Sequence, residues 1–389
     1  ILARTTSTGR SHHTHRLAVS AADGEQLRER LGAFLAGKDT NTWWKGKQEN
    51  TDQPAVAFLF TGHGSHSVNM GRALYDSEPV FRAVMDRCDA LLREHLPRPL
   101  LAVLYPQAQD GSPEYASAVD CLNDMTYGQP AMFALEVALA ALWRSWGIQP
   151  AAVAGHSLGE YAAAAVSGIL SLEDALALIA ERGRLMQQLP EDGLMVTVFA
   201  EEERVAQSIQ PYAAQVSIAA INSPETIVIS GQRDAVLAVV DTLTGQGIRT
   251  KTLNIARAAH SPMVEPMVAG MTQAVAGKHF SIPEVEFFSS VTGAVISDAI
   301  ARPDYWPRHL RQTVRFASAV QAMYDAGYRI FIEIGPHPTL INLGQRTLPE
   351  GAPVLWLPSL HSKLADRDQI LESTARLYVN GGSLDWDAF

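Results

Sequence analysis

Two kinds of hydrophobic pattern alternate along the middle of the chain. Apolar residues run without interruption through "AVAFLF" (55–60) and "AAVAG" (151–155), and each run ends at a glycine-containing turn. Between them, "GQPAMFALEVALAALWRSWG" (128–147) predicts a helix, with a proline near its start and a glycine at its end. Continuous apolar strands that alternate with helices predict a parallel sheet covered on both faces, and hence an α/β fold.

The order of predicted strands and helices changes between residues 192 and 256. Four short strand-like runs occur there, namely "GLMVTVFA", "VSIAAINS", "TIVISG" and "IRTKTLNI", with helical stretches after the first and the third. This βαββαβ order predicts a small ferredoxin-like subdomain inserted into the larger domain. We therefore expect the large domain to comprise residues 53–191 and 257–350.

The two ends of the chain look separate from this domain. Residues 1–52 contain "HRLAVSAADGEQLRERLGAFLAGK", which predicts a strand and then a helix with Leu27, Leu31 and Leu35 at four-residue spacing. The polar stretch "GKDTNTWWKGKQENTDQ" that follows is typical of a linker. Residues 351–389 predict a strand and one helix. The chain starts without a methionine or a signal sequence, so we expect a segment of a longer polypeptide.

The composition of the chain argues against several classes of function. The 389 residues include 31 basic and 41 acidic side chains, and the formal net charge of −10 argues against nucleic acid as a partner. We find no apolar run of membrane-spanning length. The two cysteines, Cys88 and Cys121, are too few for a disulfide framework and fit a reducing cytoplasm.

No metal site is expected. The sequence contains neither a CxxC nor an HExxH motif. The histidines that stand close together in sequence are interpreted as residues of loops and of a polar linker, and they are His12, His13, His15, His63 and His66.

The stretch "GHSLG" (155–159) carries the first chemical signal. Glycines on both sides of Ser157 permit a sharp turn from strand to helix, because glycine tolerates strained dihedral angles and has no side chain to collide. Such a turn exposes the Ser157 hydroxyl at the start of a helix, where free N–H groups favour negative charge. Ser157 is therefore a candidate nucleophile, and the N–H of Leu158 a candidate oxyanion donor.

A serine nucleophile needs a base. His260, in "RAAHSPMVEPM", is the better candidate, because His156 is expected to point elsewhere and to form part of the pocket wall. The glycine-containing loop "FTGHGSH" can supply the N–H of His63 as a second oxyanion donor. Arg182, 25 residues after Ser157 on a predicted helix, is suited to hold a substrate carboxylate through two hydrogen bonds.

These stretches together resemble a known family. The motifs "FTGHGSH", "GQPAMFALE", "GHSLGEY", "ERGRLMQ", "NSPETIVISG", "AHSPMVEPM", "YWPRHLRQTVRF" and "EIGPHPTL" match, in order, those of the acyltransferase domain of modular polyketide synthases. Malonyl-CoA:acyl carrier protein transacylases share that fold. Residues 1–52 resemble the linker between ketosynthase and acyltransferase, and residues 351–389 resemble the linker that follows the acyltransferase.

The resemblance implies an α/β-hydrolase-like large domain with an inserted ferredoxin-like subdomain. It implies an acyltransferase that takes an extender unit from acyl-CoA onto Ser157, activated by His260. The phosphopantetheine thiol of an acyl carrier protein then removes the acyl group. No cofactor is bound in such a reaction. The expected partners are the carrier protein and an adjacent ketosynthase domain.

The resemblance supports the candidate roles given above and assigns roles to further residues. His63 and Leu158 would form the oxyanion hole through their backbone N–H groups, and Arg182 would hold the free carboxylate of a dicarboxylic acyl unit. The remaining matches are pocket residues (Gln129, Asn222, His156, Ala259 and Arg257) and Gln312, whose backbone carbonyl would orient the catalytic histidine. The site would then be a Ser-His dyad without an acid.

The chain departs from the family pattern at two places. His63 and His66 stand where the family usually has glutamine. The motif before the catalytic histidine reads "RAAHS" (257–261), where malonyl-type domains usually read HAFHS and methylmalonyl-type domains YASHS. The small Ala259 leaves room for an α-substituent, whereas Leu158 is more usual in malonyl-type domains. The sequence favours malonyl, with methylmalonyl or another substituted malonyl as the alternative.

Two other functions stay open. A serine esterase or thioesterase would use the same turn, but with an Asp partner and an oxyanion loop that the sequence does not display. A catalytically inert docking module would keep the fold and lose the site, whereas Ser157, His260 and Arg182 are all present.

Overall fold

The computed structural model describes residues 2–38, 42–48, 53–255 and 257–389. A six-stranded sheet lies at its centre, with the strand order β10-β9-β4-β3-β11-β12. All neighbouring strands are parallel except β9 and β10. The strands are β3 (Val56–Phe60), β4 (Ala152–Gly155), β9 (Glu286–Phe288), β10 (Val295–Ile296), β11 (Ile330–Ile334) and β12 (Leu355–Pro358).

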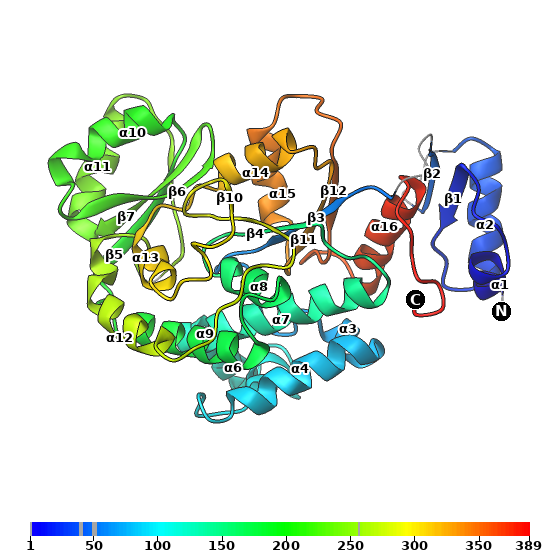
Figure 1. The fold of residues 1–389 in the computed structure, drawn as a ribbon, viewed down its shortest axis with the longest axis horizontal. Helices are drawn as coiled ribbons and strands as arrows, with labels where there is room; N and C mark the ends of the chain where they lie inside the picture. Colours follow the sequence, from blue (N-terminus) through cyan, green and yellow to red (C-terminus); the bar gives the residue numbers. More distant parts are fainter. Residues whose placement is uncertain (1, 39–41, 49–52, 256) are drawn as a thin grey trace.

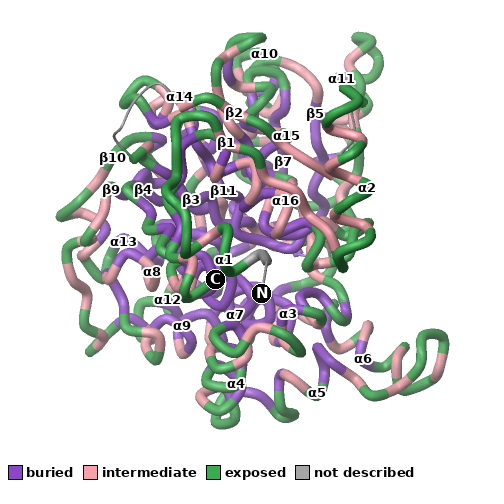
Figure 2. The backbone as a smooth tube through the Cα atoms, turned by 90° about the vertical axis from the view of Figure 1, so that its right-hand side faces the viewer, coloured by how far each residue is buried: buried purple, intermediate pink, exposed green. Residues whose placement is uncertain are grey.

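The central strands are buried on both faces, as their continuous apolar sequences require. Alternate residues of β3 face opposite layers, because Phe58 and Phe60 join one core cluster and Leu59 joins another. One layer contains α4 (Pro79–Leu92), α7 (Met125–Ser145), α8 (Gly159–Val166) and α9 (Leu172–Gln187); the other contains α14 (Phe316–Asp325) and α15 (Thr339–Thr347). Helix α7 is buried along most of its length (Figure 2).

A second, four-stranded sheet is antiparallel throughout, with the order β6-β7-β5-β8 (Figure 1). Its parts follow one another as β5 (Gly193–Val198), α10 (Glu202–Ile209), β6 (Val216–Ser223), β7 (Thr226–Gln232), α11 (Arg233–Gly245) and β8 (Thr250–Thr252). The two helices cover one face of this sheet, where Val196 and Val198 of β5 pack against them. The predicted α/β class with a ferredoxin-like insert is confirmed. The domain boundaries given above stay a prediction.

The two ends of the chain pack together beside the central sheet (Figure 1). Strands β1 (His15–Val19) and β2 (Trp43–Lys47) form an antiparallel pair that contacts α16 (Asp366–Val379). Arg16 donates to the carbonyl oxygens of Tyr378 and Gly382 at 2.8 and 2.9 Å. These contacts join residues more than 360 positions apart.

One sequence prediction for the N-terminal segment was wrong in part, and another is confirmed. Residues 43–47, predicted as part of a linker, form β2, because two tryptophans and alternating side chains pair with β1. The rest of that stretch includes 39–41 and 49–52, which lie outside the described residues. The predicted helix exists as α2 (Gly24–Leu35), but Leu35 is 83% exposed. A two-stranded sheet is too small to cover the whole apolar face of this helix.

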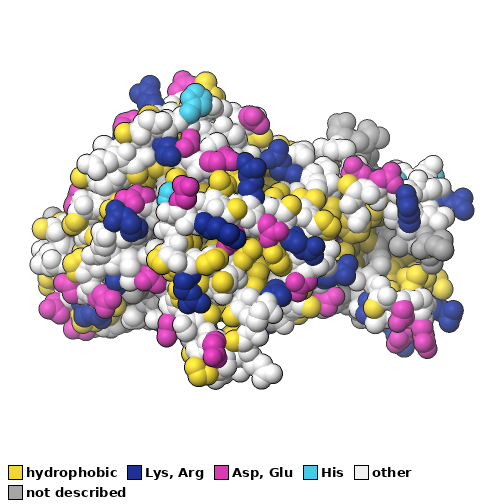
Figure 3. All heavy atoms as spheres, turned by 90° about the horizontal axis from the view of Figure 1, so that it is seen from below, with side chains coloured by type: hydrophobic (Ala, Val, Ile, Leu, Met, Phe, Trp, Pro, Cys, Tyr) yellow, Lys and Arg dark blue, Asp and Glu magenta, His cyan; other side chains and the backbone are white. Residues whose placement is uncertain are grey.

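The remaining helices complete the framework. They are α1 (Leu2–Thr8), α3 (Arg72–Ser77), α5 (Leu100–Leu104), α6 (Pro113–Asn123), α12 (Glu265–Val275), α13 (Tyr305–Arg311) and the short 3-10 segments Gln210–Tyr212 and Pro262–Val264. Among the described residues, no helix has both the length and the apolar character needed to cross a membrane. On the face beside α4 and α12, basic and acidic side chains are interspersed rather than gathered by sign (Figure 3).

Candidate active site

A cavity of about 720 Å³ lies between the carboxyl ends of the central strands and the open face of the small sheet. Thr61 follows β3 and His156 follows β4, and both line it. Ligands of parallel α/β sheets bind at these strand ends, and the volume lies within the range of small-molecule pockets, roughly 300–1,000 Å³. The cavity also brings together Ser157, Arg182 and His260, which are far apart in sequence.

The turn between β4 and α8 places Ser157 at the cavity. Ser157 has a positive φ of 53°, a conformation that costs a non-glycine residue of order 1–3 kcal/mol. Neither Gly155 nor Gly159 has a positive φ, so the predicted need for strained dihedral angles at these glycines was wrong, whereas the predicted need to avoid a side-chain collision is confirmed. Close packing explains why glycine is needed at both positions. A Cβ at Gly159 would lie 2.3 Å from the carbonyl oxygen of Phe60, and one at Gly155 would lie 2.2 Å from the backbone nitrogen of Glu160.

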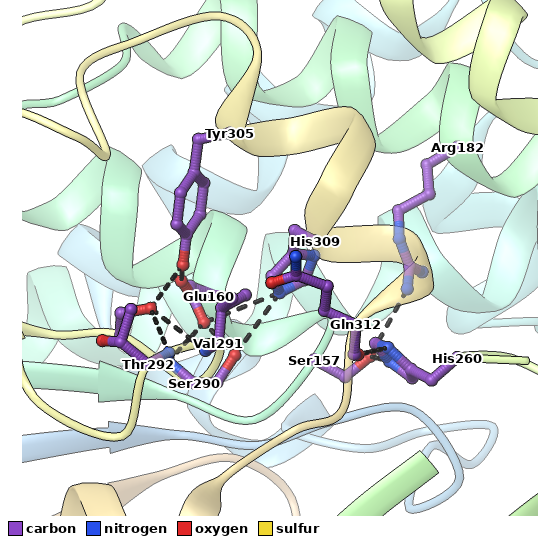
Figure 4. Close-up of polar contacts among 11 residues, drawn as sticks. Ser157, Glu160, Arg182, His260, Ser290, Val291, Thr292, Tyr305, His309 and Gln312 are labelled. Carbon is purple, nitrogen blue, oxygen red and sulfur yellow. Dashed lines mark hydrogen bonds and ion pairs between the residues drawn. The ribbon is translucent and has the colours of Figure 1, made fainter. Parts of the chain in front are cut away.

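Ser157 and His260 are in direct contact. The Ser157 Oγ lies 2.7 Å from Nε2 of His260 (Figure 4). The other ring nitrogen, Nδ1, lies 2.8 Å from the backbone carbonyl oxygen of Gln312, directly after α13. A carbonyl can only accept, so Nδ1 carries the proton and Nε2 accepts from the serine hydroxyl. His260 also has a positive φ, of 54°.

The surroundings of His260 favour its neutral form. Burial, followed by the nearby His309 and Arg182, lowers the pKa of His260 well below its ordinary value of 6.5. Burial disfavours the charged imidazolium, and a neighbouring cation does the same. A neutral imidazole is the form that accepts a proton, so this histidine is ready to act as a base at neutral pH.

The side chain of Arg182 extends from α9 toward Ser157 and is only 2% exposed. Its guanidinium donates to the side-chain oxygen of Gln129 on α7 and, at 3.4 Å, to the Oγ of Ser157. No carboxylate of the described residues forms an ion pair with it, and its Nε has no hydrogen-bond partner among them. Buried charges in proteins are normally paired. An arginine without an anion beside a nucleophile is suited to an anionic ligand.

The two candidate oxyanion donors belong to the turns that follow β3 and β4. His63 lines the cavity after β3, and Leu158 directly follows the nucleophile. In the described chain, neither backbone N–H donates to a backbone carbonyl or a side chain. Both N–H groups are thus available to a ligand. The side chain of Leu158 is buried in the core and does not line the cavity.

The side chains of His63 and His66 form a pair beneath the cavity. Their ring centroids are 4.4 Å apart, and they pack against Gly128 of α7, where a Cβ would lie 3.0 Å from Nε2 of His63. Burial, then His66 and Arg182, lowers the pKa of His63 to about 3, so its ring is neutral. The described residues contain no group of three or more side chains placed to hold a metal ion.

The other predicted pocket residues divide into two sets. His156, Asn222, Gln129 and Ala259 line the cavity. Nε2 of His156 lies 2.8 Å from the side-chain oxygen of Asn222, which joins the turn after β4 to the small sheet.

Arg257, predicted to contact substrate, does not line the cavity. Its guanidinium lies 3.0 Å from the carbonyl oxygen of Gln187 and 3.1 Å from a carboxylate oxygen of Glu191. The ion pair with Glu191, beyond the end of α9, directs Arg257 away from the nucleophile. This residue therefore supports the framework beside the site.

A buried carboxylate that the sequence pattern did not reveal lies three residues after Ser157. Glu160, in the first turn of α8, is fully buried. It accepts hydrogen bonds from the backbone N–H of Ser290 at 2.9 Å and from the hydroxyl groups of Ser290 and Tyr305 (Figure 4). Nε2 of His309 lies 3.5 Å from the same carboxylate. The available signal was a single acidic residue at the start of the apolar run "GEYAAAAV".

This carboxylate joins the two halves of the dyad. Tyr305 and His309 belong to α13, and the residue that ends α13, Gln312, holds His260 through its carbonyl. The ring centroids of His309 and His260 are 6.0 Å apart. Glu160 thus connects the helix that follows the nucleophile with the helix that orients the base.

Comparisons with known proteins identify the family of the chain. The sequence profile of the family "Acyl transferase domain" matches residues 57–383. The chain is 40% identical to "Polyketide synthase GfsB" of Streptomyces halstedii over 389 residues, 98% of this chain and 7% of that protein. It is 37% identical to "Mycoketide-CoA synthase" of Mycobacterium tuberculosis, over 98% of this chain and 9% of that protein. The chain thus spans less than a tenth of either relative.

Solved structures are similar over the whole chain. The acyltransferase domain from the second module of the salinomycin polyketide synthase has a TM-score of 0.88 and 35% identity, covering 100% of this chain and 87% of that one. The acyl transferase domain of ZmaA has a TM-score of 0.89 and 31% identity, covering 99% of this chain and 87% of that one.

A glycine substitution tests the packing of the nucleophile turn. We expect Gly159→Ala to lower the free energy of unfolding by about 1–3 kcal/mol, because the new Cβ would overlap backbone atoms that cannot move aside. Urea unfolding measures the change. Gly245→Ala is the matched control: no heavy atom lies within 4 Å of its Cβ position, and we expect it to be neutral or slightly stabilising. Equal unfolding midpoints for both variants would contradict the packing argument.

The pH dependence of serine labelling tests the state of His260. The base works when it is neutral, and its lowered pKa means that protonation begins only well below pH 6.5. We expect the rate of Ser157 labelling by a fluorophosphonate to stay constant down to that pH. In Arg182→Gln the loss of the cation should raise the pKa of His260 and move the decline to higher pH.

Arg184→Gln is the control for this experiment, because Arg184 lies on the same helix, is exposed and pairs with Glu181. A decline centred at pH 6.5 or above in the unmodified protein would show that His260 is not held neutral. Equal profiles for the two arginine variants would show that Arg182 does not contribute to the lowered pKa of His260.

Proposed function

Since this chain belongs to the family of acyl transferase domains, we propose that it loads an extender unit, malonyl or a substituted malonyl, from coenzyme A onto the phosphopantetheine thiol of an acyl carrier protein. The observation that carries the proposal is Arg182. Its buried guanidinium contacts the nucleophile and has no carboxylate partner among the described residues. An acyl group with a free carboxylate supplies the missing anion.

The first half-reaction acylates Ser157. The hydroxyl oxygen attacks the thioester carbonyl carbon while its proton moves to Nε2 of His260, which lies 2.7 Å away. The backbone N–H groups of His63 and Leu158 stabilise the oxyanion. The carbon–sulfur bond then breaks, the imidazolium returns the proton to the leaving coenzyme A sulfur, and an ester remains on Ser157.

The second half-reaction reverses these roles. The carrier thiol gives its proton to Nε2 of His260, and its sulfur attacks the ester carbonyl. The carbon–oxygen bond of the ester breaks, Ser157 recovers its proton, and the carrier leaves with the acyl group. Throughout, the carbonyl of Gln312 keeps the proton of Nδ1 in place. No metal or bound cofactor takes part.

Arg182 and Gln129 select the acyl group. Gln129 accepts a hydrogen bond from the guanidinium, which fixes the plane in which its other N–H groups point. A carboxylate in that plane receives charge-assisted hydrogen bonds, whereas acetyl or propionyl groups leave the cation unpaired. This difference favours dicarboxylic acyl groups.

The α-substituent of the malonyl group would contact a different part of the cavity wall. Ala259 lines the cavity with only a methyl group, so this wall leaves room for a substituent. Discrimination against one methyl group in an apolar pocket is worth only ~1–3 kcal/mol. We expect malonyl as the preferred unit and methylmalonyl as an accepted one.

The ends of the chain fit a place within a longer synthase. Residues 1–52 serve as the linker from a preceding ketosynthase domain, and residues 351–389 as the linker that follows the acyltransferase. A carrier protein of the same synthase is the expected acceptor, in the cytoplasm, where acyl-CoA is the donor. The proposed inserted subdomain, residues 192–256, stands in the sequence between the two parts of the large domain, 53–191 and 257–350.

Acylation of the intact chain tests the proposed function. Offered a mixture of malonyl-, methylmalonyl-, methoxymalonyl- and acetyl-CoA, the protein should gain mainly the mass of malonyl, and Ser157→Ala should gain none. Addition of holo-carrier protein should remove the adduct faster than water does. Rapid hydrolysis that the carrier cannot outcompete would indicate a thioesterase. No adduct from any acyl-CoA would indicate an inert module.

The carboxylate clamp has its own test. We expect Arg182→Ala to lower kcat/KM for malonyl-CoA about 100-fold, because charge-assisted hydrogen bonds to the carboxylate are lost. The value for acetyl-CoA should change much less, since this substrate has no carboxylate to lose. Arg184→Ala, on the same helix but exposed, is the control. Unchanged loading of malonyl in Arg182→Ala would contradict the clamp.

A further inference from the structure

Tyr161 is a buried aromatic residue close to the site that has no role so far. It lies about one helical turn after Ser157, on α8, and its side chain is fully buried. Tyr161 is not among the described residues that line the cavity. A side chain that does not reach the ligand can influence the reaction only through a residue that does.

The residue of the site that Tyr161 contacts is Arg182. The guanidinium carbon lies 5.7 Å from the centroid of the Tyr161 ring, within the range of a cation–π contact, roughly 6 Å. Both side chains are buried, and such contacts are stronger away from water than at the surface. Burial lowers the pKa of Arg182, and the nearby Tyr161 opposes this change. The ring therefore favours the charged form of the guanidinium.

The hydroxyl group of Tyr161 does not account for this effect. It forms no hydrogen bond of ordinary geometry within the described part of the chain. Burial raises the pKa of Tyr161 to about 12, so the phenol is neutral at pH 7 and cannot serve as the missing anion. What Tyr161 offers to the cation is thus the negative face of its ring.

Two different restraints act on the guanidinium. Gln129 of α7 accepts a hydrogen bond from it. The amide nitrogen of Gln129 lies 3.2 Å from the sulfur of Met186, which leaves the amide oxygen toward Arg182. A hydrogen bond sets the direction of one N–H group, whereas the Tyr161 ring restrains the guanidinium as a whole. The remaining contact, to Ser157 at 3.4 Å, is on the side where a ligand would bind (Figure 4).

The Tyr161 ring is itself held by α13. Its centroid lies 4.7 Å from the ring of Trp306 and 5.6 Å from the ring of His309, which it meets edge-on. Glu160, the neighbour of Tyr161 in the sequence, accepts a hydrogen bond from Tyr305 of the same helix. The ring therefore has little freedom to turn away from Arg182.

We propose that Tyr161 is a positioning residue, whose ring keeps the guanidinium of Arg182 beside Ser157 for the carboxylate of a dicarboxylic acyl group. The inference rests on the proposed function. An arginine side chain that is free to change rotamer must be ordered when the carboxylate binds, and this ordering lowers the affinity. A side chain that is already held avoids that loss. The benefit is specific to anionic acyl groups, because an acetyl group has no carboxylate for the guanidinium.

Substitutions of Tyr161 separate the ring from the hydroxyl. In Tyr161→Met a flexible side chain fills much of the space without a ring. We expect the ratio of kcat/KM for malonyl-CoA to that for acetyl-CoA to fall roughly 10-fold in this variant. Tyr161→Phe keeps the ring, and its ratio should stay within about twofold of the unmodified protein. Tyr161→Leu takes the place of Tyr161→Met if urea unfolding shows that the methionine variant does not fold.

Tyr105→Met is the matched control. Tyr105 is also buried and also has an arginine over its ring, because the guanidinium carbon of Arg72 lies 5.3 Å from the ring centroid. It lies at the end of α5 and is not among the described residues of the cavity. We expect this variant to be less stable than the unmodified protein, with an unchanged ratio of the two substrates.

A double-mutant cycle tests whether Tyr161 acts through Arg182. Two residues that serve one interaction give non-additive effects. In the Arg182→Gln background the guanidinium is already absent, so addition of Tyr161→Met should change the substrate ratio by less than about twofold. A further loss of roughly 10-fold in the double variant would show that the ring acts by another route. The proposal would then be wrong.

A second measurement needs no acyl-CoA. The charged or titratable groups that act on His260 are His309, Arg182 and His156. If the ring no longer holds the guanidinium, its field on the imidazole weakens and the pKa of His260 rises. The decline of fluorophosphonate labelling should therefore move to higher pH in Tyr161→Met. His309 also contacts Tyr161, and the double variant with Arg182→Gln separates the two routes, because its profile should equal that of Arg182→Gln alone.

The outcomes are distinguishable. The proposal is wrong if Tyr161→Met keeps the substrate ratio or the labelling profile of the unmodified protein. It is also wrong if Tyr161→Phe loses as much as Tyr161→Met, which would assign the effect to the hydroxyl, or if both substrates lose equally, which would indicate a change in the fold. If the unmodified protein accepts no malonyl from coenzyme A, the proposed acyltransferase function fails, and the labelling profiles still test the contact between ring and guanidinium.

Discussion

The contact between Ser157 and His260 is the constraint on which the site depends. Both residues adopt positive φ values without being glycine, and each such conformation costs of order 1–3 kcal/mol. Contacts with the surrounding structure therefore have to hold both residues in these unfavourable conformations. On the serine side, Gly155 packs directly on the backbone at the start of α8, and Gly159 packs on the backbone at the end of β3. On the histidine side, the carbonyl of Gln312 fixes the ring from the end of α13.

Glu160 explains how two separate segments keep one geometry. It sits three residues after the nucleophile and receives hydrogen bonds from Ser290 and Tyr305, while His309 lies 3.5 Å away. A buried carboxylate is tolerated only when its oxygens are satisfied, so this cluster ties α8 firmly to α13. The helix that orients His260 is thereby fixed relative to the turn that carries Ser157.

The sequence was sufficient wherever one local pattern determined the outcome. The uninterrupted apolar strands, the βαββαβ order and the "GHSLG" turn predicted the sheets and the place of Ser157. It was insufficient where tertiary contacts decide. Arg257 follows its ion pair with Glu191 away from the cavity, and "WWKGK" becomes a strand only because β1 lies beside it. The role of Glu160 depends on partners 130 and 145 residues away.

In the proposed function, Arg182 would link binding of the acyl group to the basicity of His260. The same guanidinium contacts Ser157 and contributes to the low pKa of His260. While the cation is unpaired, its field opposes protonation of the imidazole, which keeps the base neutral and also weak. A carboxylate bound to Arg182 would offset that field and raise the pKa of His260. Under the proposed function, the base would then become stronger when an anionic acyl group occupies the cavity, and one buried charge would favour such a substrate twice, in binding and in proton transfer.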